Sequence, residues 1–296
     1  MNPNELWTNR AASDIAEALQ QAGFNVCANT VDKLLRDELG LGRRQAVKDV
    51  CLGQSPDRDA QFQRIAELRA YYSCWDLPVI SVDTKKKEQL GNFHRHGACR
   101  TNGIVHTLDH DFATAGTGKI IPYGVYDVRA NEGFMMLAQG SDTGELACDA
   151  IRMWWDCMGR TRHGGVKRML VLADAGGSNG CRNYLFRQKL WELSCELGAS
   201  IRVAHLPSYC SKYNPIDHRM FSHVSRFLKG VIFRSIESIH QAIAKTKTST
   251  GLHVAVRLAE KVYERGVKAT KDFLTGDCIR YDDHLPQYNY QTIRFR

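Results

Sequence analysis

The sequence predicts an α/β protein in which helices cover both faces of a mixed β-sheet, with a small helical segment in front. Two observations lead to this prediction. Apolar residues recur at helical spacing through about the first 75 residues, and after Pro78 short β-branched runs alternate with amphipathic helices. Strands that alternate with helices in this way build a three-layer domain. A length of 296 residues allows one large domain and one small one.

The amino-terminal segment is expected to hold two short helices. The first, over 12–22, ends at Gly23, and the second, capped by Asn29 or Thr30, ends near Gly40. A helix, a glycine-containing turn and a second helix have the shape of a helix-turn-helix, although an ordinary helical hairpin has the same pattern. Basic residues give this pair a candidate DNA-binding side, namely Lys33, Arg36, Arg43 and Arg44.

The remaining elements are one more helix before Pro78 and, after Pro78, strands and helices that follow from the change in the spacing of apolar residues. A third helix, over 57–73, places Phe62, Ile65 and Leu68 on one face. The expected strands are 78–84, 120–128, 133–139, 168–173 and 201–206, the second and third joined as a hairpin at 129–132. The expected helices are 145–158, 182–197 and 214–228, each with large apolar residues in step.

Composition and charge narrow the function classes. The hydrophobic content of 43% and charged content of 24% exclude disordered and collagen-like chains. No apolar run approaches the ~20 residues of a membrane span, and the polar residues 1–10 predict no secretion. The 40 Lys and Arg against 32 Asp and Glu give a net charge of +8, which suits a polyanionic partner, although many basic proteins bind no nucleic acid.

The cysteines and histidines favour no metal or disulfide framework. The ten cysteines are widely spaced and form no C-x-x-C pair, so reduced thiols are expected. His94, His96, His106 and His110 cluster near Cys99, but the paired thiols of a structural zinc site are missing.

Three carboxylates stand out by their position. Asp83 and Asp174 end two strands, and Asp217 begins the helix that follows another strand. Because function gathers at the carboxyl ends of strands in open α/β sheets, the three are expected to meet there. Clustered carboxylates select Mg²⁺ or Mn²⁺. Basic residues flank them and are candidate DNA contacts, namely Lys85, Lys86, Lys87, Lys212 and Arg219.

Each acid also has a structural interpretation. Asp174 stands in a glycine-rich segment that is typical of a turn. Asp217 falls at the third position of a helix capped by Asn214, where a negative charge favours the helix dipole. From the residues alone, both interpretations stay open.

Several separated motifs, in order, resemble the Rhodopirellula-type DDE transposases of bacterial insertion sequences. The resemblance runs from about Asp57 to the C-terminus. The motifs are VISVDTKKKE (79–88), IPYGVYD (121–127), ADAGGSNG (173–180), SKYNPIDHR (211–219), TKTSTGL (246–252) and YNY (288–290).

The resemblance implies an RNase H-like catalytic core over 57–296, two Mg²⁺ (or Mn²⁺) ions, and cleavage and strand transfer of insertion-sequence ends. Asp83 and Asp174 match the first two catalytic, metal-binding acids. Asp217 stands where the family usually has Glu, and its carboxylate reaches about 1.5 Å less.

It also implies double-stranded DNA partners, both terminal repeats and target, and a bacterial cytoplasmic, nucleoid-associated protein. A homodimer on DNA is one arrangement that it allows. The segment 1–56 would bind DNA and looks shorter than in a complete family member. The rival interpretations are a non-catalytic DNA-binding remnant and a host nuclease on the same fold.

Overall fold

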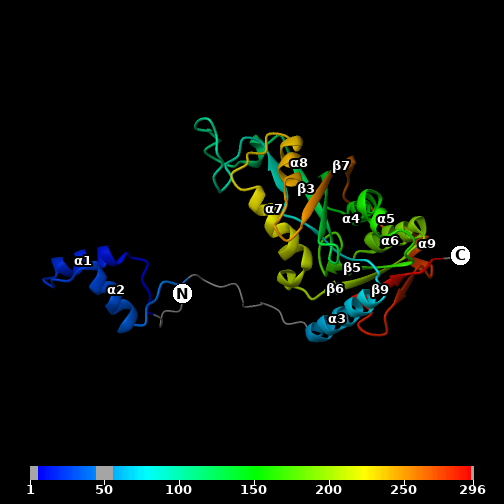
Figure 1. The fold of residues 1–296 in the computed structure, drawn as a ribbon, viewed down its shortest axis with the longest axis horizontal. Coiled ribbons are helices and arrows are strands. Elements are labelled where there is room, and N and C mark those ends of the chain that lie inside the picture. Colours follow the sequence, from blue (N-terminus) through cyan, green and yellow to red (C-terminus); the bar gives the residue numbers. More distant parts are fainter. Residues whose placement is uncertain (1–5, 45–55, 295–296) are drawn as a thin grey trace. The chain divides into compact units, whose positions relative to one another are not determined.

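The computed structural model describes residues 6–44 and 56–294, drawn as a ribbon in Figure 1. These residues form two compact units, one within 6–44 and the other within 56–294. The domain boundary expected at residue 56 adjoins residues 45–55, which lie outside the described residues, as does Cys51.

The amino-terminal unit contains the two expected helices, α1 (Ala12–Gln21) and α2 (Ala28–Asp37). The cap expected at Asn29 or Thr30 is wrong, because the backbone is extended at Cys27 and already helical from Ala28. Alanine is the strongest helix former, which explains the earlier start. The candidate DNA-binding residues are all exposed, namely Lys33, Arg36, Arg43 and Arg44.

A mixed nine-stranded sheet forms the centre of the larger unit. Its order is β7-β4-β3-β1-β5-β6-β9-β8, and β2 pairs with β3 outside this path. Neighbours are parallel at β1–β5, β5–β6 and β4–β7, and antiparallel elsewhere. The strands are β1 (Val79–Thr84), β2 (Glu88–Leu90), β3 (Gly118–Asp127), β4 (Glu132–Gly140), β5 (Arg168–Asp174), β6 (Ser200–Leu206), β7 (His253–Tyr263), β8 (Ile279–Tyr281) and β9 (Asn289–Thr292).

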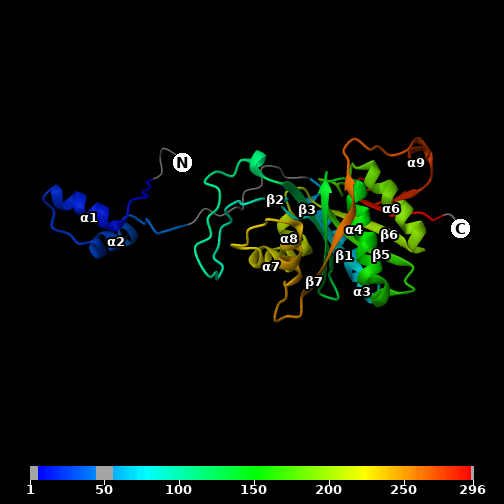
Figure 2. The same cartoon turned by 90° about the horizontal axis from the view of Figure 1, so that it is seen from above.

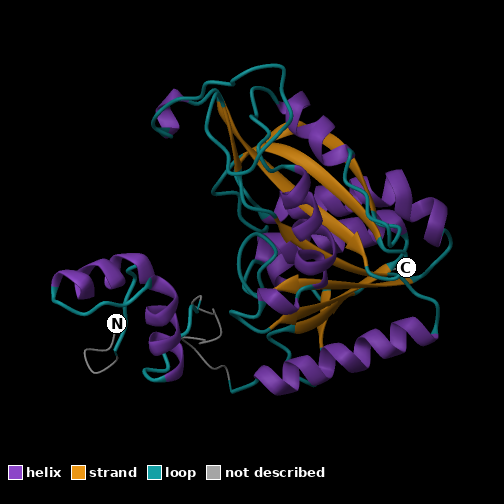
Figure 3. Ribbon diagram, turned by 60° about the vertical axis from the view of Figure 1, so that its left-hand side comes forward, coloured by secondary structure: helices purple, strands orange, loops and turns teal. Residues whose placement is uncertain are grey.

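Helices cover both faces of this sheet (Figures 2 and 3). One face packs on α4 and α6 around Trp154 and Phe186, and the other packs on α3 and α7–α8. The helices are α3 (Arg58–Cys74), α4 (Gly144–Trp154), α5 (Arg160–His163), α6 (Tyr184–Leu197), α7 (Ser222–Phe227), α8 (Ile236–Ala244) and α9 (Lys271–Thr275). Two π-helical stretches (155–159 and 217–221) and two 3₁₀ turns (113–115 and 211–213) complete the list.

The three-layer α/β/α arrangement confirms the expected fold class. The five expected strands are all present as β1, β3, β4, β5 and β6. The helix expected over 145–158 is interrupted by a π-helical stretch, and the elements from α8 onward were not predicted. Within 6–44 and 56–294, no helix combines the length and apolar character that crossing a membrane requires.

Candidate active site

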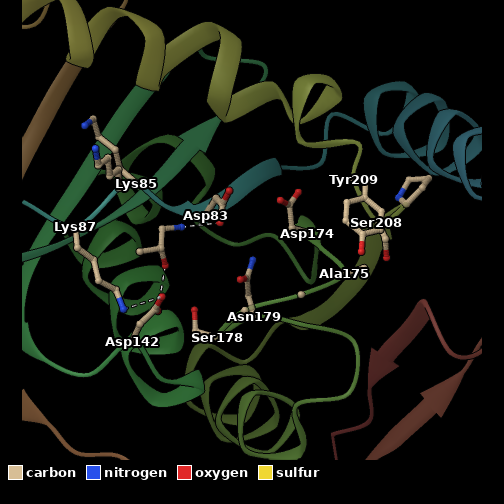
Figure 4. A pocket seen from close by; sticks show the side chains of 15 residues that line it. Asp83, Lys85, Lys87, Asp142, Asp174, Ala175, Ser178, Asn179, Ser208 and Tyr209 are labelled. Atoms are coloured by element: carbon tan, nitrogen blue, oxygen red, sulfur yellow. Dashed lines mark hydrogen bonds and ion pairs between the residues drawn. The ribbon is translucent and has the colours of Figure 1, made fainter. Parts of the chain in front are cut away.

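Two of the three candidate acids lie side by side because their strands are parallel neighbours. In the β1–β5 register Val82 pairs with Ala173, so Asp83 and Asp174, one residue further on, end adjacent strands at the same edge. Both border a cavity of about 630 Å³. Figure 4 shows the two carboxylates as neighbours in this cavity.

Asp217 approaches the pair from the π-helical stretch that precedes α7. The pKa of Asp217 is raised to about 6 by burial and by the charge of Asp174. The pKa of Asp83 is raised to about 8 by burial and by the charges of Asp174, Asp217 and Asp142, against a hydrogen bond from the Thr84 amide. Burial also raises the pKa of Asp174. The structure therefore brings the three predicted acids close enough to repel one another.

Asn214 connects two of the elements that carry these acids. Its amide nitrogen donates to Asp174 Oδ1 at 3.1 Å, and its amide oxygen accepts from the Ser81 hydroxyl. The Ser81 oxygen in turn accepts from the Ile216 amide at 3.2 Å. The helix that carries Asp217 is therefore capped by a side chain from β1, and the cap expected from the Asn214 side chain is wrong.

Replacing Ser81 by Ala is expected to lower the free energy of unfolding by about 1–3 kcal/mol, because the fully buried Ile216 amide and Asn214 oxygen lose their partner. Urea unfolding measures this. The control is Ser222→Ala, which removes an exposed hydroxyl that donates to the His218 carbonyl and should change stability by less than about 0.5 kcal/mol. Equal stability of the two variants contradicts the role of Ser81.

Sequence reasoning missed three polar residues of the cavity. Asp142, just before α4, accepts from the Thr84 hydroxyl at 3.1 Å and adds a fourth carboxylate. Asn179 and Ser178 come from the loop after β5, and the buried Ser178 hydroxyl has no hydrogen-bond partner among the residues that the structure describes. The motif ADAGGSNG contains both, but its composition is also typical of a turn and a helix cap, so the sequence alone does not single them out.

The flanking cations differ in accessibility. Lys85, expected to contact DNA, is instead 8% exposed, and its ammonium donates to Glu88 at 2.8 Å. Lys87 lies 3.9 Å from Asp142. The other three are exposed, namely Lys86, Lys212 and Arg219. The structure therefore leaves three of the five flanking cations accessible to a polyanion and ties Lys85 into an internal ion pair.

The chemistry of the acids fits a hard divalent cation. Asp83, Asp174 and Asp217 offer only oxygen donors, which suit such an ion. Burial raises the pKa of each carboxyl, and the charge of Asp174 adds to the effect at Asp83 and Asp217, so a bound cation would stabilise their charged forms. In the part of the chain that the structure describes, no three His, Cys, Asp or Glu side chains converge tightly enough to hold a metal ion.

Comparisons with known proteins identify the family of this chain. The model of the family described as Rhodopirellula transposase DDE domain matches residues 1–294, further toward the N-terminus than the motifs indicated. No curated protein matches the sequence. Solved structures that are similar include the Mos1 transposase paired-end complex with left transposon end and the Mos1 Strand Transfer Complex. Each is 15% identical, with a TM-score of 0.47 over 78% of this chain.

The chain covers 65% and 64% of the length of those two Mos1 chains. The mariner Mos1 paired end complex with Mg is 17% identical, with a TM-score of 0.47 over 78% of this chain and 65% of that one. Likeness at this level concerns the fold alone. Because the family match spans nearly all of the sequence, this chain belongs to the Rhodopirellula transposase DDE domain family.

Proposed function

We propose that this protein is a DDE transposase that cuts the ends of a DNA element and joins them to a target. The observation that carries the proposal is the β1–β5 register, which puts Asp83 and Asp174 side by side in a cavity, while Asp217 is near enough for the charge of Asp174 to raise its pKa. Membership of the family supports the same reaction class. Phosphodiester hydrolysis followed by transesterification is the proposed chemistry.

We propose Asp83, Asp174 and Asp217 as the ligands of Mg²⁺ or Mn²⁺. When bound, such ions activate an attacking water or hydroxyl and stabilise the leaving oxygen of a phosphodiester. Asn214 holds the Asp174 carboxylate at 3.1 Å, and the Thr84 amide holds that of Asp83 at 2.7 Å. These hydrogen bonds fix the direction of two ligands before DNA arrives.

Double-stranded DNA is the proposed partner, both as element ends and as target, with two copies of the chain acting as a dimer. The exposed Lys86 lines the cavity of the acids, and the exposed Lys212 and Arg219 flank Asp217 in the sequence. All three are proposed to hold phosphates. Lys87 adds a partly exposed cation. Lys85 is left out of this surface because it is buried against Glu88.

The amino-terminal helices are proposed to bind the element ends. Replacing Lys33, Arg36, Arg43 and Arg44 together by Ala should remove up to four phosphate contacts. The slope of log K against log salt for end DNA should then fall by as much as ~3.6, at ~0.9 per contact. Titration of labelled duplex at several salt concentrations measures this slope.

A quadruple variant of equal charge change provides the control. It replaces exposed cations of the larger unit by Ala, namely Arg69, Arg265, Lys268 and Lys271. It should change the slope much less, because none of these residues belongs to the amino-terminal helices or lines the cavity that holds Asp83 and Asp174. If the two quadruple variants give the same slope, the amino-terminal helices do not hold DNA.

A non-catalytic DNA-binding remnant is the second candidate function. One observation favours it, since no three acids among the described residues converge tightly enough for a metal ion. The two candidates separate in one experiment with the unaltered chain, duplex carrying the flanking terminal repeats, and Mg²⁺. Strand cleavage and joined products support the transposase, and binding without cleavage supports the remnant.

A further inference from the structure

A second cavity, of about 780 Å³, opens beside the one that holds the acids. The two share residues 175–177 and Ser208, so a ligand can extend from one to the other. A volume of this size is typical of small-ligand sites. The second cavity is also lined by the start of α6 and by the loop before β9, through Arg182, Tyr184, Arg187, Gln287 and Tyr288.

The most buried cation of this cavity has no acid to balance it. Arg187 is 6% exposed, and its guanidinium lies 4.9–5.4 Å from the ring centroids of Tyr184, Tyr281 and Tyr290. It donates to the Tyr281 hydroxyl and the Cys181 carbonyl, whereas its Nε–H is buried without a partner. Over 6–44 and 56–294, no carboxylate forms an ion pair with it. A buried positive charge held only by neutral groups attracts an anion.

Two neighbours of Arg187 are suited to a nucleotide. Arg182 is exposed beside the N-terminus of α6, where the helix dipole also favours an anion. Tyr184, in the first turn of α6, is 53% exposed and presents an aromatic side chain to the same cavity. Cations that hold a phosphate next to an aromatic ring are the usual elements of single-stranded nucleic acid sites.

The wall between the two cavities includes a glycine that the fold does not require. A Cβ added at Gly176 would meet no atom within 4 Å, and its φ lies outside the left-handed region. Its neighbour Gly177 differs, because a φ of +77° favours glycine there. The open backbone at Gly176 therefore allows a ligand to pass closely between the acids and the second cavity.

We propose that this second cavity holds an unpaired nucleotide of the DNA strand that is cut at Asp83 and Asp174. Its phosphate lies toward Arg182, Arg187 and the N-terminus of α6, and its base stacks on Tyr184. A base inside a duplex has both faces covered, so only an unpaired base can stack in this way. The proposal deepens the transposase function and rests on it for the identity of the strand.

The test compares two probes in EDTA with the full chain, namely a short oligothymidylate and a blunt duplex of arbitrary sequence. Tyr184→Ala should bind the oligothymidylate roughly 5- to 150-fold more weakly, which is the range for loss of a stacking ring, and the blunt duplex unchanged. Tyr184→Phe keeps the ring and should bind both probes like the unaltered chain. Fluorescence anisotropy gives both affinities.

Gly176→Val and Arg182→Ala complete the test. Gly176→Val should leave the thermal midpoint unchanged and weaken only oligothymidylate binding, because its side chain enters the open wall. Arg182→Ala should do the same, whereas Arg69→Ala should not, because Arg69 is an exposed residue of α3 that does not line this cavity.

Two results overturn the proposal. One is unchanged oligothymidylate affinity in Tyr184→Ala. The other is an equal loss of duplex affinity, which would make this part of an ordinary duplex surface. The binding measurements are made in EDTA and do not depend on cleavage. If the chain fails to cut DNA in the separate assay with Mg²⁺, that result counts against the proposed function and leaves the binding result standing.

Discussion

Asp83→Ala and Asp174→Ala should each slow Mg²⁺-dependent strand cleavage at least about 1,000-fold. A bound ion contributes several kcal/mol to the transition state, and each 1.36 kcal/mol is a factor of ten. Binding of the same duplex should stay equal or become tighter, because a negative charge next to phosphate is removed. Cleavage of labelled end duplex and its gel retardation measure the two quantities.

The stability of these variants is not expected to explain the loss. Asp83 is partly buried beside the charge of Asp174, so Asp83→Ala should leave the free energy of unfolding equal or higher near neutral pH without metal. Asp174→Ala relieves the same repulsion but leaves the buried Asn214 amide without its acceptor, so it should lower the free energy of unfolding by no more than about 1–3 kcal/mol. Glu260→Ala, at an exposed position on β7, is the matched control and should cleave normally. Cleavage at the unaltered rate by either Asp variant would remove the site as assigned.

Asp217→Asn should remove most cleavage if this residue binds the metal, because a neutral amide is a poor partner for Mg²⁺ and leaves its charge uncompensated. Asp217→Glu should keep or raise activity, since it restores the reach that is common in the family. Cleavage assays with both variants, beside thermal unfolding, distinguish this role from a purely structural one.

A structural role predicts a different pair of results. If Asp217 only favours the dipole of its helix, Asp217→Asn should cost no more than about 1 kcal/mol of stability and leave cleavage untouched. Full cleavage by Asp217→Asn leaves two acids and ends the three-carboxylate assignment. Burial and the charge of Asp174 raise the pKa of Asp217 to about 6, so this carboxylate interacts electrostatically with the other acids of the site.

The sequence predicted the site best where an apolar run typical of a buried strand is followed directly by an acid. The runs that became β1 and β5 are mostly apolar, as is typical of strands buried on both faces, and each has an acid at or next to its carboxyl end. Their meeting at one edge follows from parallel pairing. Asp83 and Asp174 were therefore predictable as neighbours without knowledge of any distance.

Other features depend on contacts that no local pattern reveals. Ser81 and Asn214 are 133 positions apart, and only the folded sheet shows that one hydroxyl serves both Asn214 and the Ile216 amide. The strands β8 and β9 have three and four residues, too few for a period to emerge. The edge strand β7 exposes Leu258 and Val262, so its apolar residues do not mark a single face.

The place of β9 in the sheet has a consequence during synthesis. This strand lies between β6 and β8, pairs Val203 with Tyr290, and comes from residues 289–292. While the ribosome is still adding residues before Asn289, β6 has an open edge of unpaired amides and carbonyls. Such edges recruit other strands, so a nascent or prematurely terminated chain exposes an aggregation-prone edge on β6, the strand next to the one that carries Asp174.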